Sequence, residues 1–190
     1  MYKLCKTEQS AARQHQLEQG LLQVMQTKRY EDISISELCD RLGVPRKSFY
    51  RYFLGKDGAL AALLDHTLME FTQSLPVNSR GKNNTALGEL ERFFRFWHER
   101  KPFMDALQRS GLSGMLVERS TSHAIQERMM PRYLTGLPAN AQGLAMTFCV
   151  SGLLAMVIQW HHRGYLESVE EITKVAAMML TSPLISQDMS

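Results

Sequence analysis

The chain has 190 residues, of which 44% are hydrophobic and 22% are charged, so it is long enough to bury a substantial core. This composition excludes global disorder and collagen-like structure. The formal net charge of +3 at pH 7 is too small to indicate a nucleic-acid-binding protein by itself. The three cysteines, Cys5, Cys39 and Cys149, show no CxxC spacing, which argues against a disulfide framework and favours a reducing compartment.

The sequence shows no targeting segment, and we expect a cytoplasmic protein. Residues 1–27 are polar and lack the apolar core of a secretory signal. The apolar run 144–160 has 17 residues, at the short end of the membrane-spanning range, and is interrupted by Thr147, Ser151 and Gln159. We therefore expect a core helix buried on several sides here, not a membrane span.

Apolar residues recur at intervals of three and four along the whole chain, and strand-like alternation is nearly absent. The pattern predicts an all-α fold of about nine helices. A first helix precedes a short second helix, whose N-cap is Ser34 or Ser36. Gly43 is expected to end this second helix, because glycine readily adopts positive φ, and Pro45 to open a third helix.

Six further helices follow in the rest of the chain. Residues 76–84 are rich in turn formers and are the clearest linker. A Met-rich helix is expected to run through Met129 and Tyr133 to a break at residues 136–138. Ser168 begins a capping box at the start of the last helix. The nine predicted helices cover about residues 10–27, 35–42, 45–53, 58–71, 87–97, 102–107, 115–133, 140–163 and 168–180.

Positive charge is concentrated near the beginning of the chain. Residues 1–58 hold ten Lys or Arg and seven Asp or Glu, a net charge of +3, whereas the remainder holds 12 of each sign. Residues 41–56 contain five basic side chains and no acidic one. Contact with phosphates requires a local concentration of positive charge of this kind.

Residues 33–53 have the layout of a helix-turn-helix, in which the second helix enters the major groove of DNA. The positions expected to lock the two helices together are apolar: Leu38, Leu42, Val44, Phe49 and Phe53. The outward positions carry groups that reach bases and phosphates: Arg46, Lys47, Ser48, Tyr50, Arg51 and Tyr52.

The stretch Leu42–Phe53, LGVPRKSFYRYF, followed by Gly55-Lys56-Asp57 and an apolar helix, resembles the head of the tetracycline-repressor (TetR) family. That family carries Ala/Leu-Gly-Val-Ser in the turn, an aromatic residue or Leu, then Tyr, then an aromatic residue or His, then Phe, with Lys three residues later. The similarity covers about residues 10–68. The sequence departs from the pattern at Pro45, where the family often has Ser, and at Leu17, where it often has Ile.

The resemblance implies a DNA-binding head, residues 1–57, and a helical ligand-sensing and dimerising body, residues 58–190. In the head, Arg46, Lys47 and Ser48 are expected to face base edges, with Arg46 reading a guanine. Arg51 reaches either a base or a phosphate. The expected phosphate contacts come from hydroxyl groups and one ammonium group: Ser34, Ser36, Tyr50, Tyr52 and Lys56.

The resemblance also implies that the body senses a small apolar molecule, with no bound cofactor. Twelve methionines suit an adaptable apolar cavity, although such stripes also form ordinary core. No metal site is expected, because the adjacent His161 and His162 point about 100° apart on a helix. The candidate lining residues are Phe93, Trp97, Met104, Met115, Met129, Tyr133, Phe148, Met156 and Trp160.

We expect a homodimer that binds double-stranded DNA. Two heads must reach half-sites roughly 34–36 Å apart, so a monomer would read only half of an operator. The helices at about 140–163 and 168–180 carry more apolar surface than one small body needs. Pairing with their symmetry mates in a four-helix interface would bury that surface.

Enzymatic activity is not expected, because the sequence has no Gly-rich phosphate loop, GxSxG or HExxH motif. The predicted function is sequence-specific regulation of transcription, by a repressor that an apolar effector releases from a palindromic operator. The alternative is an activator, or a protein-recruiting scaffold of the same fold without a small-molecule inducer.

Overall fold

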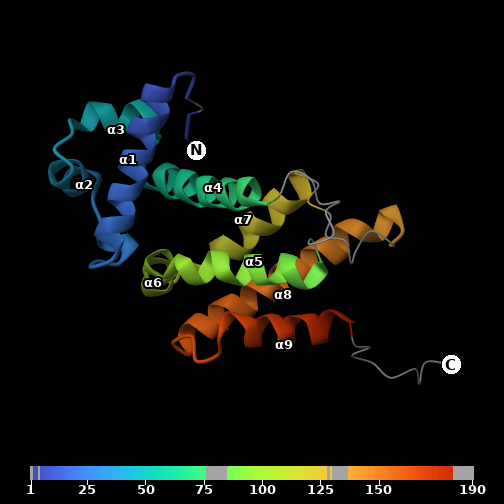
Figure 1. Cartoon of the computed structure of the whole chain (residues 1–190). Coiled ribbons are helices and arrows are strands. Elements are labelled where there is room, and N and C mark those ends of the chain that lie inside the picture. Colours follow the sequence, from blue (N-terminus) through green and yellow to red (C-terminus); the bar gives the residue numbers. More distant parts are fainter. Residues whose placement is uncertain (1, 4, 76–84, 128, 130–136, 182–190) are drawn as a thin grey trace. The chain divides into compact units, whose positions relative to one another are not determined.

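The computed structural model describes residues 2–3, 5–75, 85–127, 129 and 137–181 (Figure 1). Within these residues the chain forms nine α-helices, one short 3-10 helix and no strand beyond an isolated bridge. The predicted all-α fold is confirmed. The elements are α1 (Glu8–Met25), η1 (Tyr30–Asp32), α2 (Ile35–Arg41), α3 (Arg46–Tyr52), α4 (Lys56–Ser74), α5 (Ala86–Glu99), α6 (Lys101–Arg109), α7 (Ser113–Gln126), α8 (Ala139–His162) and α9 (Val169–Thr181).

The backbone divides into two compact units. The first comprises Met1–Gln73 and Pro102–Arg119, and the second comprises Ser74–Lys101 and Ser120–Ser190. Nearly all of α4 and α6 therefore belongs to the same unit as α1, α2 and α3. The boundary predicted after residue 57 separates a DNA-binding head from a ligand-sensing body. This functional division stays a prediction.

Local sequence signals set the ends of α2 and α3. The Ser34 hydroxyl accepts a hydrogen bond from the Glu37 N–H at 3.1 Å, so Ser34, and not Ser36, is the N-cap of α2. Gly43 follows α2 with a φ of +60°, as predicted. Pro45 precedes α3 in an extended conformation and supplies no side-chain cap.

The core of the first unit is built from apolar side chains of its helices. The Phe49 and Phe53 rings, 5.1 Å apart between centroids, are both fully buried. A Cβ atom at Gly20 of α1 would lie 2.4 Å from Leu42 Cδ1. A side chain at position 20 would therefore require the Leu42 side chain to shift. Further buried members are Leu17, Leu21, Leu38, Leu60 and Leu64.

A buried ion pair joins α1 to α4. Glu18 is fully buried, and its Oε2 lies 2.8 Å from His66 Nδ1. The hydrogen bond with Glu18 raises the pKa of His66, although partial burial opposes this effect. The titratable groups around the pair are His15, whose Nδ1 is 3.8 Å from Glu18 Oε2, and Asp65 and Glu70 of α4.

In the second unit, α5 packs along α9 and also contacts α8. Aromatic rings fill the contact between α5 and α8: Phe94 and Trp160 lie 6.1 Å apart between centroids, and His98 stacks on Trp160 at 5.3 Å. Gly164, with a φ of +71°, follows the end of α8.

The predicted capping box at the start of α9 is confirmed. The Ser168 N–H donates to Glu171 Oε2 at 2.7 Å, and the Glu171 N–H donates to Ser168 Oγ at 3.2 Å. These two bonds satisfy donors that the first turn of the helix leaves unpaired.

The prediction that α8 is buried on several sides is wrong within the single chain. One face is buried, through Met146, Cys149, Leu153, Leu154, Val157, Trp160 and His161. On another face Leu144 and Phe148 are 77% and 69% exposed. By length and composition α8 could cross a membrane, with a mean hydropathy of 1.8 and 28% of its most apolar window buried. One such helix is weak evidence for a membrane span.

The Met-rich helix is shorter than predicted. α7 ends at Gln126, and Met129 lies beyond it, with its N–H donating to the Ala124 carbonyl at 3.0 Å. The Met129 side chain packs against a buried cluster of Ala124, Met146 and Cys149. The predicted linker 76–84, Tyr133 and the break at Gly136 lie outside the described residues.

We predict that the Glu18–His66 pair makes the stability of the first unit depend on pH. Because the folded-state pKa of His66 lies above 6.5, the pair contributes fully below about pH 6.5, and its contribution is lost as the pH rises through the raised pKa. Urea unfolding between about pH 5.5 and 9 should show this loss in the wild type but not in His66→Gln. His162→Gln, at an exposed histidine, should keep the wild-type profile. An unchanged profile in His66→Gln would contradict the assignment.

Candidate nucleic-acid interface

The two helices α2 and α3 pack against each other across the turn at residues 42–45. The Val44 N–H donates to the Cys39 carbonyl at 3.0 Å, which closes the end of α2. Of the five predicted inner positions, Leu38, Val44, Phe49 and Phe53 are buried and Leu42 is partly buried. The pair is therefore held rigidly by its apolar side, as a helix-turn-helix requires.

The outer side of α3 carries four of the predicted DNA-contact residues in exposed positions: Arg46, Lys47, Tyr50 and Arg51. Ser48 is half-buried. Tyr52 differs from the expectation, since its side chain is only 7% exposed and its ring lies beside that of Phe53. α3 thus offers a mainly cationic surface to solvent, with one of its two tyrosines largely withdrawn.

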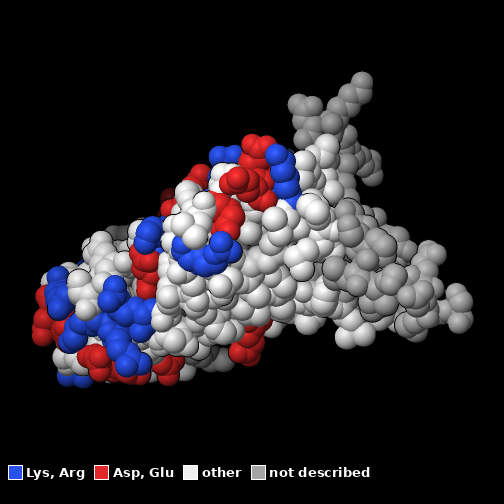
Figure 2. All heavy atoms as spheres, turned by 90° about the horizontal axis from the view of Figure 1, so that it is seen from below, with Lys and Arg blue, Asp and Glu red and all other residues white. Residues whose placement is uncertain are grey.

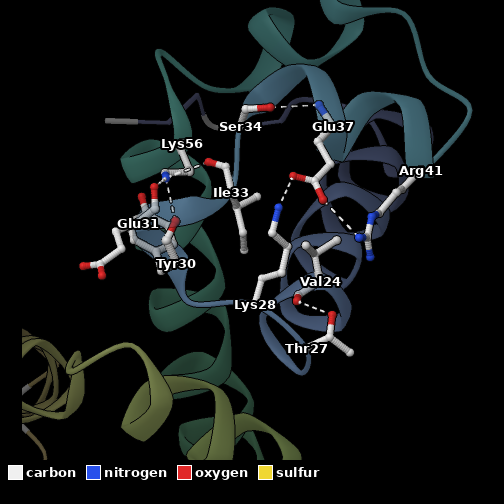
Figure 3. A network of polar contacts seen from close by, with 10 residues as sticks. All are labelled: Val24, Thr27, Lys28, Tyr30, Glu31, Ile33, Ser34, Glu37, Arg41 and Lys56. Atoms are coloured by element: carbon white, nitrogen blue, oxygen red, sulfur yellow. Dashed lines mark hydrogen bonds and ion pairs between the residues drawn. The ribbon is translucent and has the colours of Figure 1, made fainter.

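Ion pairs divide the basic side chains of the head into two groups. Lys28 and Arg41 both bind the Glu37 carboxylate, at 2.8 and 3.0 Å (Figure 3). The hydrogen bond from Lys28, and then the nearby guanidinium of Arg41, lower the pKa of Glu37, which keeps the carboxylate charged. Among the described residues, no carboxylate pairs with Arg46, Lys47 or Arg51. α3 therefore carries three exposed basic side chains whose charge no carboxylate among the described residues neutralises.

The structure gives Lys56 a different role from the predicted phosphate contact. Its ammonium donates to the carbonyls of Tyr30, Glu31 and Ile33, at 2.5, 3.2 and 2.7 Å (Figure 3). It also lies 4.4 Å from the centroid of the Tyr30 ring. An ammonium has three N–H donors, so these bonds use all of them within the protein. Lys56 is a structural clamp between η1 and the start of α4.

A second contact strengthens the same junction. The Tyr30 hydroxyl donates to Asp57 Oδ1 at 2.5 Å, and burial together with this carboxylate raises the pKa of Tyr30 well above its usual range. The hydroxyl therefore remains a donor. The two predicted serine contacts lie on the adjoining segment: Ser34 is exposed and Ser36 is half-buried.

A polar hollow of about 520 Å³, which was not predicted from the sequence, adjoins α3. It is lined from α1 by Gln9, Ser10, Ala12, Arg13 and Gln16, and from α3 by Ser48, Arg51 and Tyr52. The α1 residues fall on one side of that helix, at positions 9, 13 and 16. Their periodicity was visible in the sequence, but only the packing shows that this side meets α3.

The predicted effector-contact residues are not all gathered in one unit. Met104 and Met115 belong to the first unit. Phe93, Trp97, Met129, Phe148, Met156 and Trp160 belong to the second. Phe93 and Trp97 lie 6.4 Å apart between centroids, and Phe93 also contacts Phe94, whose ring lies against Trp160. Phe148, 69% exposed, does not line an interior site within this chain.

This fold and this surface define a helix-turn-helix DNA-binding protein. Residues 20–63 match the family model described as bacterial regulatory proteins, tetR family. The matched segment covers the second half of α1, all of α2 and α3, and the start of α4.

Solved structures share the fold over most of the chain. FadR of Bacillus halodurans, a fatty acid degradation regulator, is 17% identical with a TM-score of 0.65, covering 95% of this chain and 98% of that one. A tetR-family regulator from Streptomyces coelicolor is 20% identical, with a TM-score of 0.62 and coverages of 90% and 79%. The dihydroxyacetone kinase operon activator DhaS is 17% identical, with a TM-score of 0.56 and coverages of 88% and 93%. No curated protein matches.

Residues 20–63 therefore form a DNA-binding head of the tetR type, and most of the chain shares the fold of a solved tetR-family regulator. The family assignment made from residues 42–57 is confirmed.

We predict that Lys56→Met destabilises the head without removing a DNA contact. Methionine keeps most of the apolar stem but loses three charge-assisted hydrogen bonds, so the free energy of unfolding should fall by about 1–3 kcal/mol. The salt dependence of DNA binding by the folded variant should match that of the wild type. Chemical denaturation and fluorescence anisotropy measure the two quantities. A lower salt slope with unchanged stability would restore Lys56 as a phosphate contact.

Proposed function

We propose that the chain is a homodimeric repressor that binds a palindromic operator and is released by an apolar small molecule. The observation that carries the DNA-binding part is the surface of α3. Three basic side chains, Arg46, Lys47 and Arg51, are exposed there without a carboxylate partner among the described residues, on a helix locked by its apolar side. Such a helix can enter the major groove without reorganising.

The first residues of α3 are proposed to read bases. Arg46 and Lys47 are exposed in the first turn, and an arginine fork matches the O6 and N7 acceptors of guanine. Ser48 is half-buried and lies beside them, where its hydroxyl can contact a base edge. Recognition helices commonly use these N-terminal positions for base contacts.

The flanking groups are proposed to hold phosphates. Tyr50 is 44% exposed and carries its hydroxyl on the outer side of α3, and Arg51 is exposed one residue later. Ser34 and Ser36 present hydroxyl groups at the start of α2. Tyr52 is proposed to contact a phosphate through the hollow that it lines, whereas the Lys56 ammonium uses its donors within the protein.

The proposed dimer uses α8 and α9. Apolar side chains are exposed on both helices: Leu144 and Phe148 on α8, and Val175, Met178 and Met179 on α9. Figure 2 shows a broad area without Lys, Arg, Asp or Glu on one face of the chain. Burying such side chains stabilises by about 1.5–3 kcal/mol for each large residue. A symmetric four-helix contact would bury them together.

An apolar effector is proposed to bind the second unit and release the protein from its operator. Its support is a continuous run of ring contacts in the second unit, from Trp97 to Phe93, from Phe93 to Phe94 and from Phe94 to Trp160. An effector that binds the released state better by about 1–3 kcal/mol changes operator occupancy usefully. DhaS is described as an activator, so activation is the second candidate, and a reporter gene behind the operator distinguishes the two signs.

We predict that Arg46→Ala with Lys47→Ala abolishes the footprint on the operator. Each lost base contact should weaken binding by about 1–3 kcal/mol, and the variant should remain a dimer. The footprint is measured on DNA flanking the protein's own gene at physiological salt with competitor DNA. Arg95→Ala with Arg109→Ala removes the same charge from exposed positions on α5 and α6 and should leave the footprint intact. An unchanged footprint in the α3 variant would refute α3 as the recognition helix.

We predict that Phe148→Glu converts a dimer to a monomer. The new carboxylate would have to be buried without a partner in the proposed interface, at a cost of several kcal/mol. Sedimentation velocity measures the mass, and operator affinity should fall in parallel. Leu87→Glu, at a half-exposed leucine of α5, should leave the dimer intact. Dimers of unchanged stability in Phe148→Glu would exclude this face of α8 from the interface.

A further inference from the structure

The hollow between α1 and α3 has the chemistry of an anion site. Two guanidinium groups, Arg13 and Arg51, line it, and no Asp or Glu is among its lining residues. The other polar groups of the lining, amides and hydroxyls, all include hydrogen-bond donors. A group with several acceptor oxygens and negative charge satisfies such a lining, and arginine forks match phosphate oxygens in pairs.

The side chain of Arg13 is already oriented by its own helix. Arg13 Nη1 donates to Gln16 Oε1 at 2.6 Å, which uses one of the five N–H donors of the guanidinium. The amide NH2 of Gln16 stays available as a second kind of donor. Arg13 is partly buried, so its position is restricted more than that of a fully exposed arginine.

The N-terminal segment fixes the wall of the hollow that α3 provides. The Lys3 N–H donates to the Tyr52 carbonyl at 2.9 Å, and Tyr2 forms an isolated bridge with Phe53. The Tyr2 hydroxyl donates to Asp65 Oδ2 at 3.0 Å. Burial, and then the Asp65 carboxylate, raises the pKa of Tyr2 to about 12, so this donor persists at neutral pH. The end of α3 is therefore held in place before any ligand binds.

We propose that this hollow receives a phosphate of the DNA backbone next to the bases read by α3, and that Arg13 and Gln16 of α1 are DNA-contact residues. The proposal rests on the proposed function, since Ser48 and Arg51 belong both to the hollow and to the α3 surface. A contact from α1 adds affinity and register but no base information, because every sequence presents the same phosphate.

The test compares Arg13→Ala, Arg13→Lys and the wild type on operator DNA and on an unrelated duplex, over a range of NaCl concentrations. Arg13→Ala should weaken binding to both duplexes by roughly tenfold. The slope of log K against log[NaCl] should fall in magnitude by about 0.9 per head, hence about twice that per dimer. Arg13→Lys should restore the slope while recovering the affinity only in part, because lysine lacks the fork.

The control Arg109→Ala removes one exposed positive charge from the first unit and should change neither quantity. Thermal unfolding of each variant verifies that the head is folded. If Arg13→Ala binds with wild-type affinity and slope while the wild type protects its operator, this inference is overturned and the proposed function stands. If the wild type binds no DNA, both are overturned.

Titration with inorganic phosphate at constant ionic strength separates the two sources of the same anion. Saturable phosphate binding that Arg13→Ala abolishes, together with an unchanged DNA salt slope, would mean that the hollow takes a free anion and would overturn the DNA assignment. Weak phosphate binding with the predicted change in slope supports it.

Discussion

The three hydrogen bonds of the Lys56 ammonium control the geometry of the head. They bind the carbonyls of Tyr30, Glu31 and Ile33 just before α2, while the backbone of Lys56 begins α4. Both ends of the segment that contains α2 and α3 are therefore fixed at one point. Between them, exposing Phe49 or Phe53 would cost about 1.5–3 kcal/mol each, so α3 cannot rotate freely about its axis. Its polar side stays directed to solvent.

Electrostatics within the head follows from the same packing. A basic residue next to the core finds an acceptor inside the protein, as Lys28 and Arg41 do on Glu37 and Lys56 does on backbone carbonyls. The side chains of α3 that point away from the core find none among the described residues. A net charge of +3 over the whole chain thus understates the positive potential at α3. The packing of the head thus leaves the basic side chains of α3 exposed, while Lys28 and Arg41 share the carboxylate of Glu37.

In the second unit, α8 and α9 carry apolar side chains that the chain itself does not bury. α8 presents one face to α5 and leaves another face, with Leu144 and Phe148, in solvent. A high hydropathy over the whole helix predicts burial on all sides, yet the structure divides the residues between two faces. An amphipathic pattern cannot reveal such a division, because both faces are apolar. The proposed complement of the exposed face is a second protein surface, because a large exposed apolar patch marks an interaction site.

Local rules were sufficient for the parts of the chain whose structure is decided by neighbouring residues. The all-α fold, the N-cap among two serines, the positive φ of Gly43, the capping box of α9 and the family of the head all follow from short-range sequence signals. Packing decided the contacts between residues that are far apart in the sequence. It turned Lys56 inward, withdrew Tyr52, ended α7 before Met129 and brought Arg13 of α1 beside Arg51 of α3. The sequence by itself determined which helices form and which residues could bind DNA. Only the tertiary structure decided which of those residues keep hydrogen-bond donors available for DNA. The physical reason is that a donor binds any acceptor that the fold places within hydrogen-bond distance.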